Sequence, residues 1–336
     1  MRKSLLAGVG LSLALSACNA PSAETESAGS TLTDTNRARI TEYARLRQVG
    51  ATHEEMEQFN SAARIEHNPE IPDGIEGDRT FLEARREAAP DKYDPLDKYV
   101  NVTHSILADG EFVAVKSHLF VSPSDRGRIF FDIWRLKDGQ IAEHWDVIEP
   151  VGPEADALAV MSCGVGITYE AAKAVGNTAE NPSCGKADLS VDSEASRKLV
   201  LAYLEASMDP ARLTDAVQTY LAPDFALHRP NVPAGHQGLL DYLKARTAQR
   251  KEENRRHHVQ RVLADGDLVL VHRWVTSDTD PRGVAYADLF RVKNGKIIDH
   301  WDLAQPVPPF SVAGRSMTGG ADTPLEPNRV KGPAQH

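Results

Sequence analysis

Apolar positions with a helical period occupy the early part of each half of this chain. From Ser193 to Met208 the apolar residues fall on one face of a helix. They are Ala195, Leu199, Ala202, Tyr203 and Ala206. Similar stripes run through residues 211–220 and 237–249. These three segments are therefore predicted to be helices.

Positions rich in β-branched and aromatic residues follow the helical stripes. They occupy 268–276, 284–293 and 296–304, and turn residues separate them. Asn294-Gly295 is a strong two-residue hairpin signal, and Asp138-Gly139 is its equivalent earlier in the chain. Helices followed by a run of antiparallel strands predict an α+β fold.

Four motifs occur twice in the same order, which indicates an internal duplication. The first is separated by 161 positions, as from His67 to His228, and the other three by 156, as from His144 to His300. The pairs are 67–74 with 228–235, 107–110 with 263–266, 132–139 with 288–295, and 144–146 with 300–302. A five-residue insertion in the first copy accounts for the change in spacing.

The repeated unit resembles a known family. Its order is a helix, a His-x-Pro segment, a second helix, and strands ending in Gly-Lys-Ile-x-x-His-Trp-Asp, with Gln140 replacing that Lys in the first copy. This resembles the SnoaL-like polyketide cyclases of the nuclear-transport-factor-2-like superfamily, and most closely their aldol-condensation subgroup. The resemblance implies two tandem cone-shaped domains, each a curved mixed sheet with packed helices around a pocket.

The repeats and the composition between them predict the domain organisation. Residues 36–153 form the first SnoaL-like domain and 193–309 the second. Residues 154–192 form a linker. Residues 19–35 are rich in Ser, Thr, Ala and Glu, which predicts a solvated tether. Residues 310–336 lack periodicity and are predicted to be a disordered tail.

The N-terminus has the features of a lipoprotein signal. Two basic residues precede a 13-residue apolar run, Leu5 to Ala17, which is too short to span a bilayer as a helix. The run ends in Leu15-Ser16-Ala17-Cys18, which resembles a bacterial lipobox with Cys18 as the lipidated residue. An ordinary secretory signal is the alternative. The lipobox predicts a membrane-anchored protein facing the periplasm or the cell surface. Asn19 after the Cys weakly favours the outer membrane.

The remaining cysteines are predicted to pair. Cys163 and Cys184 enclose 20 residues of the linker, and two cysteines in an oxidising compartment favour a disulfide over free thiols. Closing such a loop contributes roughly 3 kcal/mol. The net charge of −10 argues against non-specific nucleic-acid binding, and the lipid anchor is the only expected membrane contact.

Strand alternation identifies candidate catalytic groups. Residues two apart share a face, so one carboxylate is expected among aromatic neighbours on each central strand, and a His and an Asp share a face on each last strand. Buried carboxylates beside imidazoles are typical of general acid–base sites. The candidates are Asp132, His144 and Asp146 in the first copy, and Asp288, His300 and Asp302 in the second.

Five further residues are expected to bind a substrate near the mouth or wall of each cone. These are His67, His118, Trp134, His228 and His272. Turn capping is an alternative for His67 and His228. No metal or cofactor is predicted, because tight ligand spacings and Gly-rich phosphate loops are absent from the sequence.

Two functions are consistent with these features. One is a cofactor-independent enzyme that removes a proton next to a carbonyl of a small apolar substrate, leading to aldol-type cyclisation, isomerisation or dehydration. The alternative is a non-catalytic module that binds a small ligand or a protein. Fusing two copies also predicts an intramolecular pseudo-dimer, or a homo-oligomer.

Overall fold

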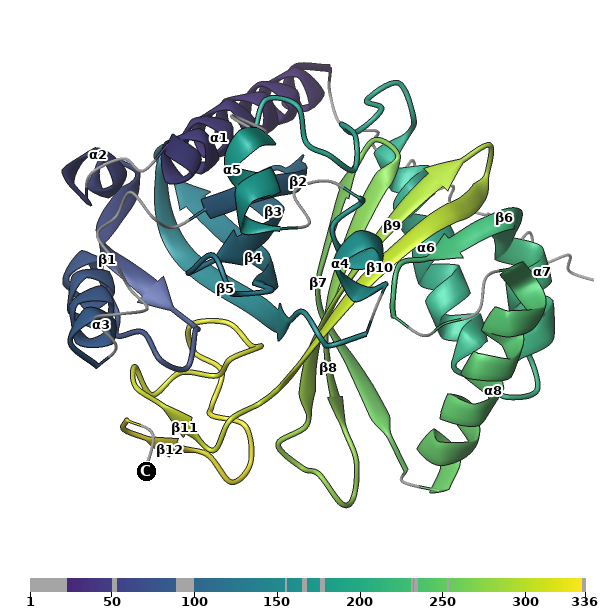
Figure 1. Ribbon diagram of the computed structural model, residues 1–336. Coiled ribbons are helices and arrows are strands. Elements are labelled where there is room, and N and C mark those ends of the chain that lie inside the picture. Colours follow the sequence, from purple (N-terminus) through teal and green to yellow (C-terminus); the bar gives the residue numbers. More distant parts are fainter. Residues whose placement is uncertain are drawn as a thin grey trace, which may run out of the picture.

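The computed structural model describes residues 23–49, 53–88, 100–154, 156–164, 168–175, 179–230, 232, 235–252 and 254–333. Cys18 and the predicted signal lie outside these residues. The chain folds as α+β with two five-stranded mixed sheets, as the sequence predicts (Figure 1). Among the described residues, no helix combines the length and apolar character needed to cross a bilayer.

Domain 1 consists of the first sheet and its helices. Its helices are α1 (Ala23–Val49), α2 (His53–Glu57) and α3 (Ile75–Ala88). Its strands are β1 (Asn60–Glu66), β2 (Val100–Asp109), β3 (Phe112–Phe120), β4 (Arg128–Lys137) and β5 (Gln140–Pro150), in the order β1-β5-β4-β3-β2. Only β1 pairs in parallel, with β5.

Domain 2 repeats this plan. Its helices are α6 (Ser193–Ser207), α7 (Leu213–Tyr220) and α8 (Gly235–Glu252). Its strands are β6 (Leu221–Leu227), β7 (Arg256–Asp265), β8 (Leu268–Thr276), β9 (Val284–Lys293) and β10 (Lys296–Pro306), in the order β6-β10-β9-β8-β7. Both predicted hairpin turns are present, and positive φ at Asn294 and Gly295 matches the twist of the strands they join.

The two sheets pack against each other through the faces turned away from their helices. One apolar cluster contains residues of both sheets, including Phe131 and Trp145 from domain 1 and Leu289 and Trp301 from domain 2. Each domain keeps a second cluster between its sheet and its own helices. In each domain, this second cluster lies beside a cavity between the sheet and the helices.

Contacts between the domains occur in reciprocal pairs. Arg37 of α1 is paired with Asp265, and its equivalent Arg197 of α6 is paired with Asp109 at 2.6 Å. The backbone N–H of Ala108 donates to Asp265 and that of Ala264 donates to Asp109, each at 3.0 Å. Such mutual exchange is the pattern of a twofold interface, so the chain forms an intramolecular pseudo-dimer. A homo-oligomer stays a prediction.

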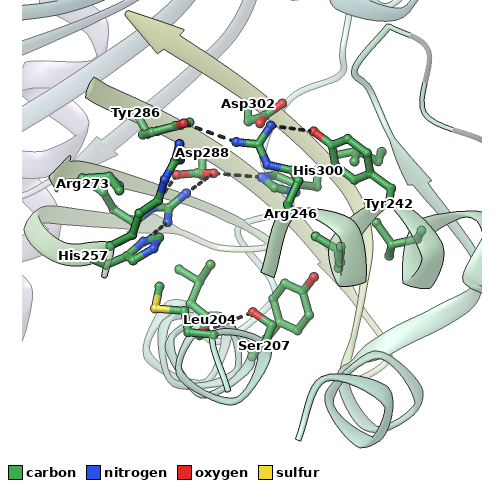
Figure 2. Close-up of a pocket in the computed structure, with 17 residues that line it drawn as sticks. Leu204, Ser207, Tyr242, Arg246, His257, Arg273, Tyr286, Asp288, His300 and Asp302 are labelled. Carbon is green, nitrogen blue, oxygen red and sulfur yellow. Dashed lines mark hydrogen bonds and ion pairs between the residues drawn. The ribbon is translucent and has the colours of Figure 1, made fainter. Parts of the chain in front are cut away.

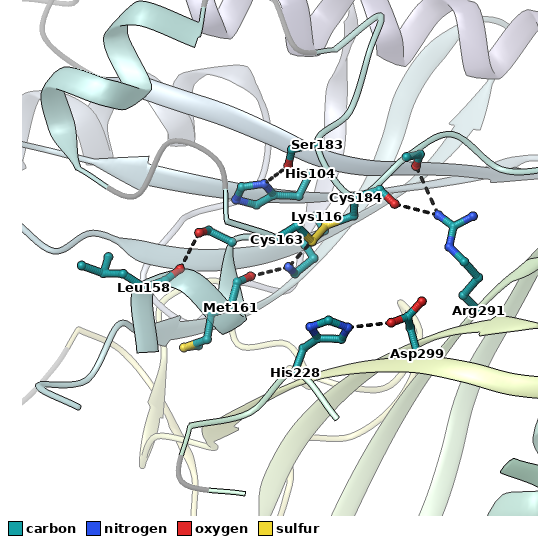
Figure 3. The surroundings of a disulfide bond; sticks show 12 residues. His104, Lys116, Leu158, Met161, Cys163, Ser183, Cys184, His228, Arg291 and Asp299 are labelled. Carbon is teal, nitrogen blue, oxygen red and sulfur yellow. Dashed lines mark hydrogen bonds and ion pairs between the residues drawn. A yellow bond between two sulfur atoms is a disulfide. The ribbon is translucent and has the colours of Figure 1, made fainter. Parts of the chain in front are cut away.

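The linker carries α4 (Ala157–Met161) and α5 (Tyr169–Val175), and Cys163 and Cys184 form a disulfide across it (Figure 3). The backbone of Cys184 binds both domains, because its N–H donates to His104 O and its carbonyl accepts from Arg291. Lys116 lies beside this disulfide and donates to Met161 O, and burial lowers its pKa to about 7.

Two predictions about the ends of the domains are wrong. The described part of the predicted tether is helical, since α1 begins at Ala23 and Thr33 contacts Gly110 of domain 1. The predicted disordered tail is folded against domain 1, where its strands β11 (Phe310–Ser311) and β12 (Val330–Lys331) pair (Figure 1). A buried ion pair between Glu326 and Arg329 lies within this tail. The tail is therefore ordered by polar contacts, although its sequence has no apolar periodicity.

Candidate functional site

A cavity of about 620 Å³ lies between the sheet and the helices of domain 1. Strand alternation brings Asp132, Trp134, His144 and Asp146 to its wall, because Asp132 lies opposite Asp146 and Trp134 opposite His144 across β4 and β5. Such a volume accommodates a drug-sized molecule, and the wall combines apolar side chains with a few convergent polar groups.

His144 is held between two carboxylates. Its Nδ1 lies 2.9 Å from Glu66 Oε1 and its Nε2 lies 3.1 Å from Asp132 Oδ1. Burial opposes the charged form of His144, but the two carboxylates outweigh it and raise its pKa to about 10. The imidazole is therefore a cation at neutral pH with both nitrogens occupied.

Asp132 is the ionised partner of this cation. Burial opposes its charge, but Arg47 of α1, at 3.1 Å, and His144 outweigh burial and lower the pKa of Asp132. A carboxylate paired on both oxygens is a poor proton acceptor, so Asp132 positions His144 and does not act as the base.

Asp146 has a different environment from its neighbour Asp132. Asn68 donates to its Oδ2 at 2.6 Å, whereas its buried Oδ1 has no hydrogen-bond partner among the described residues. Burial raises the pKa of Asp146 to about 7, and the charges of Glu66 and Asp132 add to this. A carboxyl in the wall of a cavity, with a pKa near neutrality and one oxygen without a hydrogen-bond partner, is suited to exchange protons with a ligand.

The charges around the cavity explain why Asp146 stands apart. Buried Arg64 binds Glu66 at 2.9 Å and also binds Asp78. Together with the two pairs already described, the cations Arg47, Arg64 and His144 offset the anions Asp132, Glu66 and Asp78. Asp146 has no ion pair of its own among the described residues, and its burial together with the charges of Glu66 and Asp132 outweighs the charge of His144 and favours its neutral form.

The equivalent cavity of domain 2 measures about 80 Å³ (Figure 2). Asp288, His300 and Asp302 line it, as the sequence predicts. Arg273 forms a bidentate pair with Asp288 at 2.7 and 2.8 Å and points into the space. Arg229 lies 2.9 Å from Asp302. Both carboxylates of domain 2 therefore have an arginine partner.

Four predicted substrate-binding histidines lie on the wrong face of their sheets. His118 is opposite Ile129, and His272 is opposite Ala287, on the faces where the two sheets meet. His67 stacks on Trp145 and His228 stacks on Trp301, also on those faces. The expectation that these four bind substrate is wrong, because none of them lines either cavity. On β3 and β8 the neighbouring residues Ser117 and Arg273 lie on the face of the sheet that is turned toward the cavity instead.

Three residues important to the site were missed by the sequence analysis: Arg47, Glu66 and Asn68. A comparison of the aligned repeats contains the signal, because Glu66 corresponds to Leu227 and Asn68 to Arg229 in the second copy. Glu66 carries the clearer signal, because a charged residue at a position that is apolar in the other copy marks a difference in the buried site.

One group of three metal-binding residue types occurs among the described residues. Ligand atoms of Asp132, His144 and Asp146 lie within 4.8 Å of one another. Arg47 and Glu66 already satisfy two of these side chains. Asp132 and His144 are thus already paired, and a metal bound by them would have to displace an ion pair.

Residues 200–300, within domain 2, match the model of the SnoaL-like domain family. Solved structures similar to the chain include a candidate ketosteroid isomerase from Kribbella flavida, at 20% identity over 34% of this chain and 81% of that protein, with a TM-score of 0.29. An NTF2-like protein of unknown function from Cytophaga hutchinsonii is 16% identical over 33% of this chain and 90% of its own, with a TM-score of 0.26. No curated protein matches the chain.

Proposed function

We propose that domain 1 is a cofactor-independent acid–base enzyme that removes a proton adjacent to a carbonyl of a small, largely apolar substrate. Asp146 is the base. The observation that carries this assignment is the position of Asp146 in the wall of a cavity of about 620 Å³, with a buried Oδ1 that has no hydrogen-bond partner among the described residues and a pKa of about 7. Aldol-type cyclisation, isomerisation and dehydration all begin with this step.

The proton and charge transfer use residues of the cavity wall. The carboxylate of Asp146 takes the proton from the carbon next to the carbonyl. The electron pair of that C–H bond forms a C=C bond, and the π pair of the carbonyl moves to its oxygen. Arg47 and Tyr43, which line the same cavity from α1, supply donors for the resulting enolate oxygen. His144 keeps the neighbouring Asp132 ionised and in place. Return of the proton from Asp146 completes an isomerisation.

Proton exchange tests this function without knowledge of the natural substrate. Cyclohexanone, 2-decalone and 2-tetralone are incubated in D₂O with the mature chain, and exchange of their α-protons is followed by NMR. We expect exchange above the buffer rate for the ketones that fit, and Asp146→Asn to reduce it by about 100-fold. The matched control is Asp302→Asn in domain 2, which leaves the rate unchanged.

Two results would contradict the proposal. One is equal exchange by the wild type and Asp146→Asn, and the other is no exchange above buffer with any of the three ketones. Saturable binding of a ketone without exchange would instead support the non-catalytic binding module.

Anchoring of the chain in the cell envelope is a second part of the proposal. The lipobox-like Leu15-Ser16-Ala17-Cys18 supports lipidation at Cys18, and the disulfide between Cys163 and Cys184 is typical of an oxidising compartment. Labelled palmitate should enter the wild type in cells and should not enter Cys18→Ser. Labelling of Cys18→Ser would exclude this anchor.

A further inference from the structure

The small cavity of domain 2 has a chemistry of its own. It lies between α6, α8 and the strands β8 to β10, and measures about 80 Å³ (Figure 2). Since a water molecule occupies about 30 Å³ of the liquid, such a space holds only a few heavy atoms. Apolar side chains form one side of it, and arginine and tyrosine side chains form the other.

Asp288 and Asp302, the two carboxylates of this cavity, each already have an arginine partner. Asp288 accepts from Arg273 twice and lies 3.1 Å from His300 Nε2. Asp302 is paired with Arg229, which reaches it from outside the lining. Neither carboxylate is therefore available to neutralise a further cation in the cavity.

Arg246 of α8 contributes a further positive charge to this cavity. Among the described residues it has no carboxylate partner, and its hydrogen bonds go to Tyr242 Oη at 3.2 Å and Tyr286 Oη at 3.5 Å. Figure 2 shows its guanidinium between the two phenol groups. Because guanidinium only donates, both hydroxyls act as acceptors toward it, and each keeps its own proton to donate elsewhere.

The three side chains thus present donors and a positive charge without an acceptor. The ligand that complements such a group is an oxyanion, which accepts from a planar guanidinium and from hydroxyls. Apolar residues such as Leu243 and Met208 also line the cavity and favour an anion with a short hydrocarbon group over a fully hydrated one.

We propose that domain 2 binds a small carboxylate, with Arg246, Tyr242 and Tyr286 holding the carboxyl group and the apolar wall holding a chain of a few carbons. This site is separate from the proton-transfer cavity of domain 1 and does not depend on its function. Duplication has in this view given one copy a reaction cavity and the other a site for a small acid.

Calorimetric titration of the mature chain with butyrate, acetate and inorganic phosphate tests the proposal. We expect saturable binding of one butyrate, with weaker binding of acetate and phosphate. Arg246→Gln should weaken butyrate binding by at least about tenfold, because a charge-assisted pair is lost. Tyr286→Phe, which removes a single donor, should weaken it by a smaller factor. The control is Arg256→Gln, since Arg256 is exposed and pairs with Asp278 on the surface.

Each other outcome overturns the proposal. These are the absence of saturable butyrate binding, equal affinity in Arg246→Gln and the wild type, and preference for phosphate over butyrate. Far-UV circular dichroism establishes that each variant is folded, and Tyr286→Phe keeps the test valid if Arg246→Gln is not. Ketone exchange by domain 1 should be unchanged in Arg246→Gln, so failure of this proposal is distinguishable from failure of the enzyme assignment.

Discussion

The two domains share a sheet order and yet enclose cavities of about 620 and 80 Å³. An exchange of arginine positions contributes to this difference. Tyr43 packs on Trp134 and Tyr203 packs on Phe290, which aligns the two helices. Four residues further on, domain 1 has Arg47 and domain 2 has Ser207.

On the neighbouring strand the pair is reversed, with Ser117 in domain 1 and Arg273 in domain 2. Both arginines neutralise the equivalent carboxylate, Asp132 or Asp288. An arginine from the helix leaves the strand face open, whereas an arginine from the strand occupies the space. The same ion pair can thus be kept while a cavity is opened or closed.

A second difference concerns the side chains behind His144 and His300. Domain 1 has a buried polar network where domain 2 is apolar. The aligned pairs are Asn60 and Leu221, Arg64 and Phe225, Glu66 and Leu227, and Asp78 and Leu239. A network of this kind is costly to bury and is retained where it tunes a charge, here that of His144.

The largest expected effect comes from breaking this network at one point. Glu66→Leu, which introduces the residue of domain 2, removes one buried carboxylate partner from both His144 and Arg64 and leaves excess positive charge in the network, so it should destabilise the protein by about 3–5 kcal/mol in urea unfolding. Introducing all four apolar residues of domain 2 should recover much of that loss, because apolar replacement of a buried ionic network is often neutral. A quadruple variant less stable than Glu66→Leu would contradict this account.

The pH dependence of stability should differ between the equivalent carboxyls Asp146 and Asp302. The pKa of Asp146 is about 7 in the fold and about 3.9 in an unfolded chain. Between these values the folded state binds more protons, so the contribution of Asp146 to stability is lost as pH rises from about 4 to 7. Asp146→Asn should therefore be more stable than the wild type at pH 8, by about 2–4 kcal/mol, and equal to it at pH 4.

Thermal unfolding at the two pH values measures this difference. Asp302→Asn provides the comparison, since Asp302 already has Arg229 as a partner and should not gain stability at high pH. A gain in Asp302→Asn equal to that in Asp146→Asn would show that burial of a carboxyl, and not its lack of a cation, sets the effect.

Exchanging the arginine positions in domain 1 tests what sets the cavity volume. The double variant Arg47→Ser, Ser117→Arg reproduces the arrangement of domain 2, so Asp132 keeps an arginine partner while the new side chain enters the cavity. We expect a folded protein whose ketone exchange is reduced by at least about tenfold, because the new side chain takes space and Arg47 no longer donates to the enolate oxygen. Ser117→Ala, which adds no volume, should retain exchange. Full activity of the double variant would contradict this account, because it would show that the position of the arginine does not control access to the cavity.

The sequence predicted the hairpins, the three helices of the second copy and six of the acidic and imidazole groups that line the cavities, because period and repetition are local signals. It could not predict which of these groups is the base. The partner that fixes His144 is Glu66, 78 residues away, and it is reached only through the parallel pairing of β1 with β5. The four misplaced histidines have the same cause, since a strand's facing depends on register as well as alternation.

The smallest expected effect concerns the part of the domain 1 cavity that is lined by residues from outside domain 1. Ala304, Gln305 and Pro306 at the end of β10, and Phe310 of the tail, line the cavity of domain 1, whereas the equivalent end of β5 does not line that of domain 2. Phe310→Ala removes apolar surface that a substrate contacts, remote from Asp146. It should raise KM a few-fold, by about 1 kcal/mol of binding, and leave kcat unchanged.

Val330 is a matched control, because it pairs with Phe310 on the adjacent strand but faces solvent. Val330→Ala should change neither constant. A fall in kcat in Phe310→Ala would instead mean that the tail acts on the geometry of the base and not on substrate contact. In that case the folded tail would belong to the catalytic arrangement of domain 1, and the contrast between the two cavities would lie in this added segment as well as in the arginines.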